Sequence, residues 1–152
     1  MEMQKTCAFT GHRQVENDLD TELLEKLVVE FTEGGCNTFL CGMALGFDMI
    51  AAETVIKLKR EYPHIKLIAC VPCDGQSRYF PRDEKLRYDR IINECDDVKI
   101  LSSRYYNGCM QARDRYMVDN SSVLIAYRRK NEGGTHYTVK YALSQNKRIC
   151  LI

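Results

Sequence analysis

The alternation of short, β-rich apolar runs with stretches of helical periodicity is the feature that most constrains the fold of this 152-residue chain. Apolar runs bounded by glycine, proline or polar residues indicate strands, whereas apolar residues spaced three and four apart indicate helices. The predicted strands are residues 6–10, 38–41, 65–71, 98–101, 123–127 and 148–152. The predicted helices begin at Asp20 or Thr21, Phe47, Arg82, Gly108 or Met110, and Thr135, and they end before Gly34 and at Glu61, Glu94, Asp119 and Ser144.

Repeated β-α units of this kind imply a single, mainly parallel sheet with helices on both faces. We therefore predict the α/β class and a Rossmann-like three-layer sandwich, with about six strands in the order 3-2-1-4-5-6. The chain shows no internal repeat, low-complexity segment or linker. Residues 1–152 are accordingly expected to form one domain, which buries roughly two-thirds of the surface of the unfolded chain.

The composition is ordinary for a soluble globular protein, with 45% hydrophobic and 28% charged residues. A formal net charge of +1 gives no global field that would attract nucleic acid or anionic lipid. The sequence begins Met-Glu-Met-Gln-Lys, without the apolar stretch of a signal peptide. No run approaches the ~20 apolar residues of a membrane span. These features predict a cytoplasmic protein without a membrane partner, and they argue against a nucleic-acid partner.

The eight cysteines are expected to be reduced, because disulfides are rare in cytoplasmic proteins. Cys7, Cys41, Cys70 and Cys150 lie in predicted strands, where a thiol packs as a small hydrophobic group. Cys70 and Cys73 match C-x-x-C, but the helix start that would lower a thiol pKa lies about ten residues farther on. No second pair completes a zinc site, so no metal site is predicted.

Polar and glycine-rich residues follow the predicted strands. Ligands of open α/β sheets bind at the carboxyl ends of the strands, near the point where the strand order reverses. The candidate ligand-binding residues at these ends are Thr10, Gly11, His12 and Arg13 after the first strand; Gly42, Gly46 and Asp48 after the second; Arg113 after the fourth; and Gly133, Gly134 and Thr135 after the fifth.

Two of these loops have the chemistry of anion sites. Gly46 and Gly134 lie where helices begin, and a missing Cβ allows a ligand to approach the backbone N–H groups at the positive end of the helix dipole. Arg13 or Arg113 could bind a phosphate through two hydrogen bonds, and Asp48 suits ribose hydroxyls. The alternative remains that Gly46 is a turn glycine, that Asp48 only favours the first turn, and that the glycine pair closes a surface loop.

Four short motifs occur in order along the chain: Thr10-Gly11-His12-Arg13, Gly42-x-Ala44-x-Gly46-x-Asp48, Arg113-Asp-Arg-Tyr116-Met-Val-Asp119 and Gly133-Gly134-Thr135-x-x-Thr138-Val-x-Tyr141-Ala142. In these motifs the chain resembles the bacterial YpsA/YoqJ-like proteins of the SLOG superfamily, which also holds DprA (Smf) and the "lonely guy" phosphoribohydrolases. The resemblance covers residues 5–152. It implies a single SLOG-type Rossmann-like domain that binds a nucleotide or a nucleotide-derived ligand, such as an NAD- or ADP-ribose-like molecule. Because such relatives often self-associate, a homo-oligomer stays an open alternative that no sequence feature marks.

One departure from the superfamily bears on catalysis. The phosphoribohydrolase branch has the motif Pro-Gly-Gly-x-Gly-Thr-x-x-Glu, whose glutamate serves cleavage of the N-glycosidic bond, and here Thr138 occupies the glutamate position. A threonine neither transfers protons well at neutral pH nor stabilises a developing cation. Asp48 and His12 are the remaining candidates for a catalytic group, and the sequence favours a protein that is not an enzyme.

Three functions follow as hypotheses. The first is a nucleotide-binding domain that acts as a sensor or regulator, because glycine-opened helix starts occur without a clear catalytic carboxylate. The second is an N-glycosidic nucleotide hydrolase that uses Asp48 or His12. The third is a single-strand nucleic-acid or protein-interaction module that uses residues 128–130 and the pair Tyr105-Tyr106.

Overall fold

The computed structural model describes residues 1–152 and contains six strands and five α-helices, preceded by the short 3-10 helix η1 (Met3–Lys5). The strands are β1 (Thr6–Gly11), β2 (Thr38–Cys41), β3 (Lys66–Val71), β4 (Asp97–Ile100), β5 (Val123–Tyr127) and β6 (Arg148–Leu151). The helices are α1 (Thr21–Glu33), α2 (Phe47–Leu58), α3 (Arg82–Glu94), α4 (Cys109–Asp119) and α5 (Gly133–Ser144). Every predicted element is present.

All five pairs of neighbouring strands are parallel, which confirms the predicted α/β class and parallel sheet. The strand order β4-β3-β2-β1-β5-β6 differs from the predicted 3-2-1-4-5-6. Helix α3 packs beside α2, so β4 continues the sheet beyond β3, and the direction of strand addition reverses only after β4. The handedness rule for β-α-β crossovers fixes the side of each helix but not the strand at which the direction reverses.

The sheet has a hydrophobic core on each face. Phe9, Phe39 and Tyr127 belong to the core under α1, α2 and α3, and the intervening residues Ala8 and Leu40 belong to the core under α4 and α5. Because side chains alternate across a strand, a strand buried on both faces must be apolar at nearly every position. Strand β5 meets this condition at every position, and β1 and β2 combine apolar residues with buried threonines.

Local sequence signals account for the ends of α1. The Asp20 carboxylate accepts a hydrogen bond from the Leu23 amide at 2.9 Å, which satisfies one of the unpaired donors of the first turn. Gly34 follows the last residue of the helix, as predicted. Helix α5 begins at Gly133, two positions before the predicted Thr135, so both glycines belong to its first turn.

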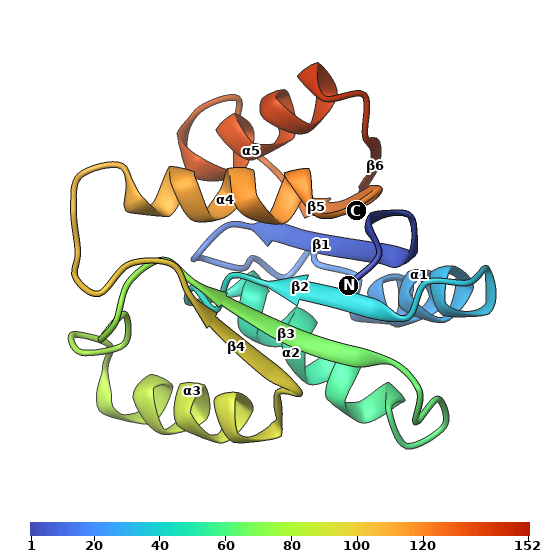
Figure 1. The fold of residues 1–152 in the computed structure, drawn as a ribbon, viewed down its shortest axis with the longest axis horizontal. Helices are drawn as coiled ribbons and strands as arrows, with labels where there is room; N and C mark the ends of the chain where they lie inside the picture. Colours follow the sequence, from blue (N-terminus) through green and yellow to red (C-terminus); the bar gives the residue numbers. More distant parts are fainter.

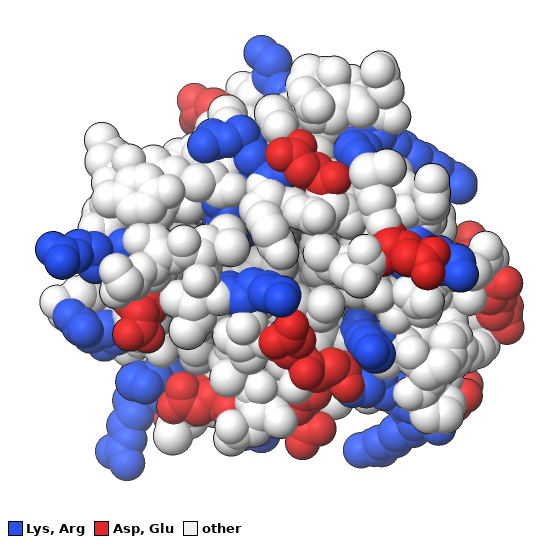
Figure 2. Space-filling model, viewed as in Figure 1, with Lys and Arg blue, Asp and Glu red and all other residues white.

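The eight cysteines form no disulfide in the structure, and most of them are buried. No α-helix combines the length and the apolar character that crossing a membrane requires. Positive and negative side chains are interspersed over the face in Figure 2, with no large area of one sign.

The order of the strands places the site. Strands β2 and β5 lie on opposite sides of β1, so β1 is the switch point: β2, β3 and β4 are added on one side of it, and β5 and β6 on the other. The connections that leave β1 and β5 at their carboxyl ends, on the left-hand side of Figure 1, therefore diverge onto opposite faces of the sheet.

Candidate ligand-binding site

A cavity of about 460 Å³ opens at the carboxyl ends of β1 and β5. Nine of the eleven predicted ligand-binding residues line it: Thr10, Gly11, His12, Arg13, Asp48, Arg113, Gly133, Gly134 and Thr135. Residues from four elements that lie far apart in the sequence thus meet at the switch point. Gly42 and Gly46 are near the cavity but do not line it.

The start of α5 is open to the cavity. Gly133 has φ of +87°, which favours glycine, and a Cβ on Gly133 or Gly134 would meet no atom within 4 Å. The amides of Gly133, Gly134 and Thr135 donate to no acceptor in the protein, and the side chain of Glu132 does not cap the helix. Three unpaired donors at the positive end of a helix dipole form an arrangement suited to an anion.

The start of α2 is closed, unlike the predicted arrangement. Gly46 has φ of +84°, and a Cβ there would overlap the backbone carbonyl of Arg13. The first amide of α2, on Phe47, donates to the carbonyl of His12 at 3.1 Å. Gly46 therefore allows the loop after β1 to lie against α2, and the helix start is shielded from a ligand.

Two further glycines allow close packing. A Cβ on Gly11 would overlap the ring of Phe47, and a Cβ on Gly42 would overlap the guanidinium of Arg113. The glycines of the first two predicted loops thus permit tight contacts that shape the cavity wall, whereas those at α5 leave open space.

Arg113 forms part of the cavity floor and is only 5% exposed. Its guanidinium donates to the carboxylate of Asp114 at 2.7 Å and to the carbonyl of Gly42. The carboxylates of Asp114 and Asp48 raise the pKa of Arg113 against the cost of burial. Arg113 thereby links α4 to the end of β2 and brings positive charge to the floor.

Asp48 points an unsatisfied oxygen into this environment. One carboxylate oxygen accepts from the Ala44 amide at 3.1 Å, whereas Oδ1 is buried without a partner. Burial raises the pKa of Asp48 to about 7, although Arg113 lowers it. Below that pH the group is a neutral carboxylic acid, which both donates and accepts hydrogen bonds and suits a sugar hydroxyl.

Asp114 is a site residue that our sequence analysis missed. It lines the cavity, and its Oδ2 accepts a hydrogen bond from the hydroxyl of Thr138 at 3.0 Å. Thr138 is fully buried, and its hydroxyl oxygen also lies 2.9 Å from the carbonyl oxygen of Gly134, so the two acceptors share one hydroxyl proton. The carboxylate of Asp114 thus lies beside Thr138, which occupies the position of the glutamate in the phosphoribohydrolase motif. The sequence contained a clue to this role, because Asp114 directly follows the predicted site residue Arg113 in the third motif.

His12 has one ring nitrogen occupied. The amide of Arg129 donates to its Nε2 at 2.7 Å, so the ring is neutral with the proton on Nδ1. Burial lowers the pKa of His12, and the charges of Lys130 and Arg129 lower it further. Protonation of Nε2 would break the bond to Arg129, which makes His12 poorly suited to accepting a proton through that atom.

Within the basic run 128–130, only Arg129 forms an ion pair. Arg129 pairs with Asp18 and lies over the ring of Tyr127, 4.3 Å from its centroid. Lys130 lines the cavity and has no ion-pair partner. The same is true of Arg13, which comes from the loop after β1. These two cations lie at the cavity, near the start of α5.

The fold and the switch-point cavity define the class of the protein, a Rossmann-like α/β protein with a candidate ligand site at the carboxyl edge of its sheet. The model of the YspA SLOG family matches residues 7–150, so the chain belongs to this family.

Relatives by sequence are found in bacilli and related bacteria. A UPF0398 protein of Brevibacillus brevis is 31% identical over 122 residues, which cover 78% of this chain and 65% of the relative. The SPbeta prophage-derived protein YoqJ of Bacillus subtilis is 29% identical over 136 residues, covering 82% of this chain and 80% of YoqJ. This chain therefore spans slightly less than two-thirds of the Brevibacillus relative.

Solved structures share the fold. DNA processing protein A of Helicobacter pylori superposes with a TM-score of 0.70 at 20% identity, over 98% of this chain and 65% of that one. The Streptococcus pneumoniae protein of the same name gives the same TM-score and identity, with 50% of its chain covered.

Proposed function

We propose that this protein binds a nucleotide or a nucleotide derivative, including ADP-ribose- or NAD-like molecules, and acts as a sensor or regulator. The observation behind the proposal is the start of α5, where the amides of Gly133, Gly134 and Thr135 have no acceptor. A phosphate group placed there receives hydrogen bonds from unpaired donors and the favourable end of the helix dipole. The unpaired cations Arg13 and Lys130 line the same cavity and add charge-assisted contacts.

The rest of the cavity suits the uncharged parts of such a ligand. The volume of about 460 Å³ lies within the range of small-molecule sites. Asp48, with its pKa raised to about 7, offers an acid group to a ribose hydroxyl. Asp48 and the start of α5 thus supply separate contacts for the sugar and the phosphate of one molecule.

Gly134 allows a direct test, because a side chain at this position meets open space and its φ is not positive. Gly134→Asp and Gly134→Asn have nearly the same shape and differ in one negative charge. Calorimetric titration with AMP and ADP-ribose is expected to show about 10- to 100-fold weaker binding to Gly134→Asp than to Gly134→Asn, because the added carboxylate repels the phosphate group.

Thermal unfolding of both variants serves as the control, since an acidic residue at a helix start does not destabilise the fold. Equal affinities of the two variants would contradict phosphate binding at α5. Failure of wild-type protein to bind any member of the panel at millimolar concentration would remove the proposed function altogether.

A second candidate function is hydrolysis of an N-glycosidic bond. The observation that favours it is the Asp114 carboxylate beside Thr138, together with Asp48 in the same cavity. Acid-base cleavage of a glycosidic bond uses two carboxyl groups in different environments, one as the general acid and one as the general base or as a group that stabilises charge. Release of free base from nucleoside monophosphates, lost in Asp114→Asn and Asp48→Asn, would establish this activity. A wild-type rate equal to that of both variants would exclude it.

A third candidate comes from the shared fold. The Helicobacter pylori protein has a single-stranded DNA binding mode, and a DNA strand contains the same phosphate and base groups as a free nucleotide. Binding of single strands by this protein should weaken steeply with salt. Absence of a gel shift at low salt would argue against it.

A further inference from the structure

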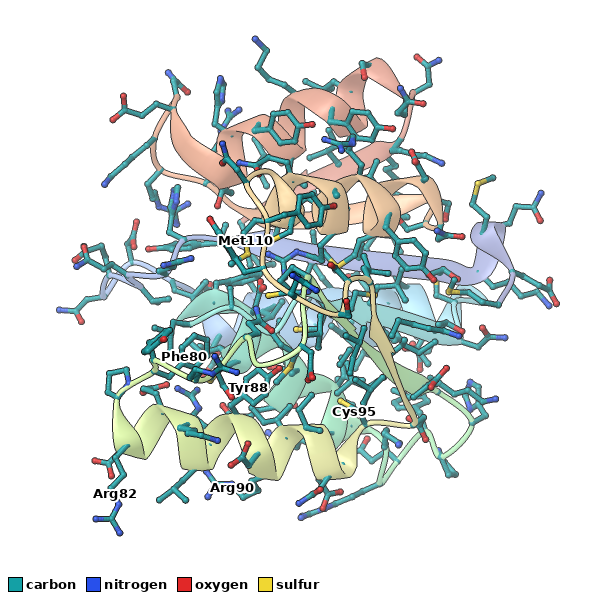
Figure 3. All side chains as sticks on the ribbon, turned by 60° about the vertical axis from the view of Figure 1, so that its left-hand side comes forward. Phe80, Arg82, Tyr88, Arg90, Cys95 and Met110 are labelled. Carbon is teal, nitrogen blue, oxygen red and sulfur yellow. The ribbon has the colours of Figure 1, made fainter.

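A second hollow, of about 370 Å³, adjoins the first cavity at the carboxyl edge of the sheet. The connections from β3 to α3 and from β4 to α4 form it, and it shares Arg13, Ala44 and Met110 with the first cavity. Figure 3 turns this edge toward the viewer, with Met110 at the start of α4 above Phe80 at the approach to α3. The two spaces are therefore neighbours that share part of their lining.

The second hollow has a lining different from that of the first. Tyr79 and Tyr105 line it with 90% and 65% of their surface exposed. Arg78 and Arg104 line it as well, and neither has an ion-pair partner. Exposed aromatic rings beside unpaired arginines are the groups on which nucleobases stack.

One wall of the second hollow is held in place. The ring of Phe80 packs edge-on against that of Tyr88, with 5.7 Å between the ring centroids. The hydroxyl of Tyr88 donates a hydrogen bond to the side-chain oxygen of Gln76 at 3.1 Å. Gln76 in turn donates to the carbonyl of Gly42, which also accepts from Arg113 in the first cavity. One backbone carbonyl thus anchors both lining segments, so their separation is fixed before a ligand arrives.

We infer that the second hollow is a stacking subsite for the second base of a dinucleotide, whose first nucleotide occupies the cavity at α5. This inference rests on the proposed function and specifies its ligand class. Arg13 lies between the two spaces, where the phosphate linkage of such a molecule would pass. Stacking requires only the π-face that every base has, so this subsite selects for a second aromatic base and not for its identity.

The test compares the affinity for AMP with that for two dinucleotides, 5′-phosphorylated diadenylate and diadenosine pyrophosphate. Their linkages distinguish a phosphodiester, as at the end of a nucleic-acid strand, from a free pyrophosphate-linked molecule. The ratio of dinucleotide to AMP affinity is measured for wild type, for the double variant Tyr79→Ala/Tyr105→Ala, and for Tyr106→Ala. Tyr106 is the matched control, since it is 48% exposed next to Tyr105 but does not line the hollow.

For at least one dinucleotide, wild type and Tyr106→Ala are expected to show a ratio of about 5 to 150, the fold-change that stacking of one base provides. The double variant should bring this ratio close to one. A second readout uses the absence of tryptophan from the chain. Tyr79→Trp introduces a single tryptophan, whose emission should be quenched by the dinucleotide and not by AMP.

Two results would overturn the subsite and leave the proposed function intact: a wild-type ratio near one with AMP still bound, or a high ratio that the double variant retains. Failure of AMP, ADP-ribose and both dinucleotides to bind would instead overturn the proposed function, and the subsite with it.

Discussion

Asp48 provides a quantitative test of the electrostatics of the cavity. Burial raises its pKa from 3.8 to about 7 in the folded protein, although Arg113 favours the charged form. Between these values the folded protein holds a proton that the unfolded chain releases. The contribution of Asp48 to stability is therefore fully present below its unfolded pKa and is lost as the pH rises through about 7.

The expected magnitude follows from the shift itself. One pKa unit corresponds to about 1.4 kcal/mol, so the full shift corresponds to about 4 kcal/mol. Asp48→Asn has a similar shape, keeps an acceptor for the Ala44 amide and does not titrate. The free energy of unfolding of Asp48→Asn relative to wild type should thus increase by up to about 4 kcal/mol between about pH 4 and pH 8.

Urea unfolding followed by circular dichroism across this pH range measures the difference. Subtracting the wild-type curve cancels the contributions of the exposed carboxylates Asp18 and Asp97 to the pH dependence of stability. The pKa values of these two groups are lowered, so their contributions have the opposite sign to that of Asp48. Asp74→Asn is the control, because Asp74 is an exposed carboxylate at the same edge of the sheet. Parallel wild-type and Asp48→Asn curves would refute the reasoning, since they would mean that Asp48 titrates equally in both states.

Three further outcomes are expected. Gly46→Ala should destabilise the fold by about 2 kcal/mol or more in urea unfolding, because its Cβ overlaps the Arg13 carbonyl and φ is +84°, whereas Gly134→Ala should change stability by about 1 kcal/mol or less. Thr138→Val should cost about 1–3 kcal/mol by leaving Oδ2 of Asp114 without its donor, and Thr138→Ser, which keeps the hydroxyl, should cost less. AMP should bind more weakly to wild type at about pH 8 than at about pH 6 as Asp48 ionises, and calorimetry of Asp48→Asn should show a smaller difference.

The fold was largely predictable because its signals are local. Apolar runs define β1, β2 and β5, and Asp20 and the glycines after α1 mark the ends of that helix. The strand order was not predictable in the same way, since it depends on the packing of α3 against α2. One clue existed: Lys99 lies in the middle of β4, and a lysine inside a strand is typical of a sheet edge.

The candidate site was predictable as a set of residues but not as a geometry. The rule for parallel sheets brings together the loops that follow β1, β2 and β5. It does not show that the backbone of His12 and Arg13 covers the start of α2, which changes Gly46 from an opening into a packing position. Nor does it show that Asp114 supplies a carboxylate next to Thr138, because that contact joins two helices through tertiary packing.

Crystals of the wild-type protein soaked with AMP would test the central claim most directly. We expect the phosphate oxygens within hydrogen-bonding distance of the Gly134 and Thr135 amides, with the ribose toward Asp48 and the cations Arg13 and Lys130 at the phosphate. A phosphate bound elsewhere, or an AMP-saturated crystal with no ligand density at the start of α5, would contradict the account.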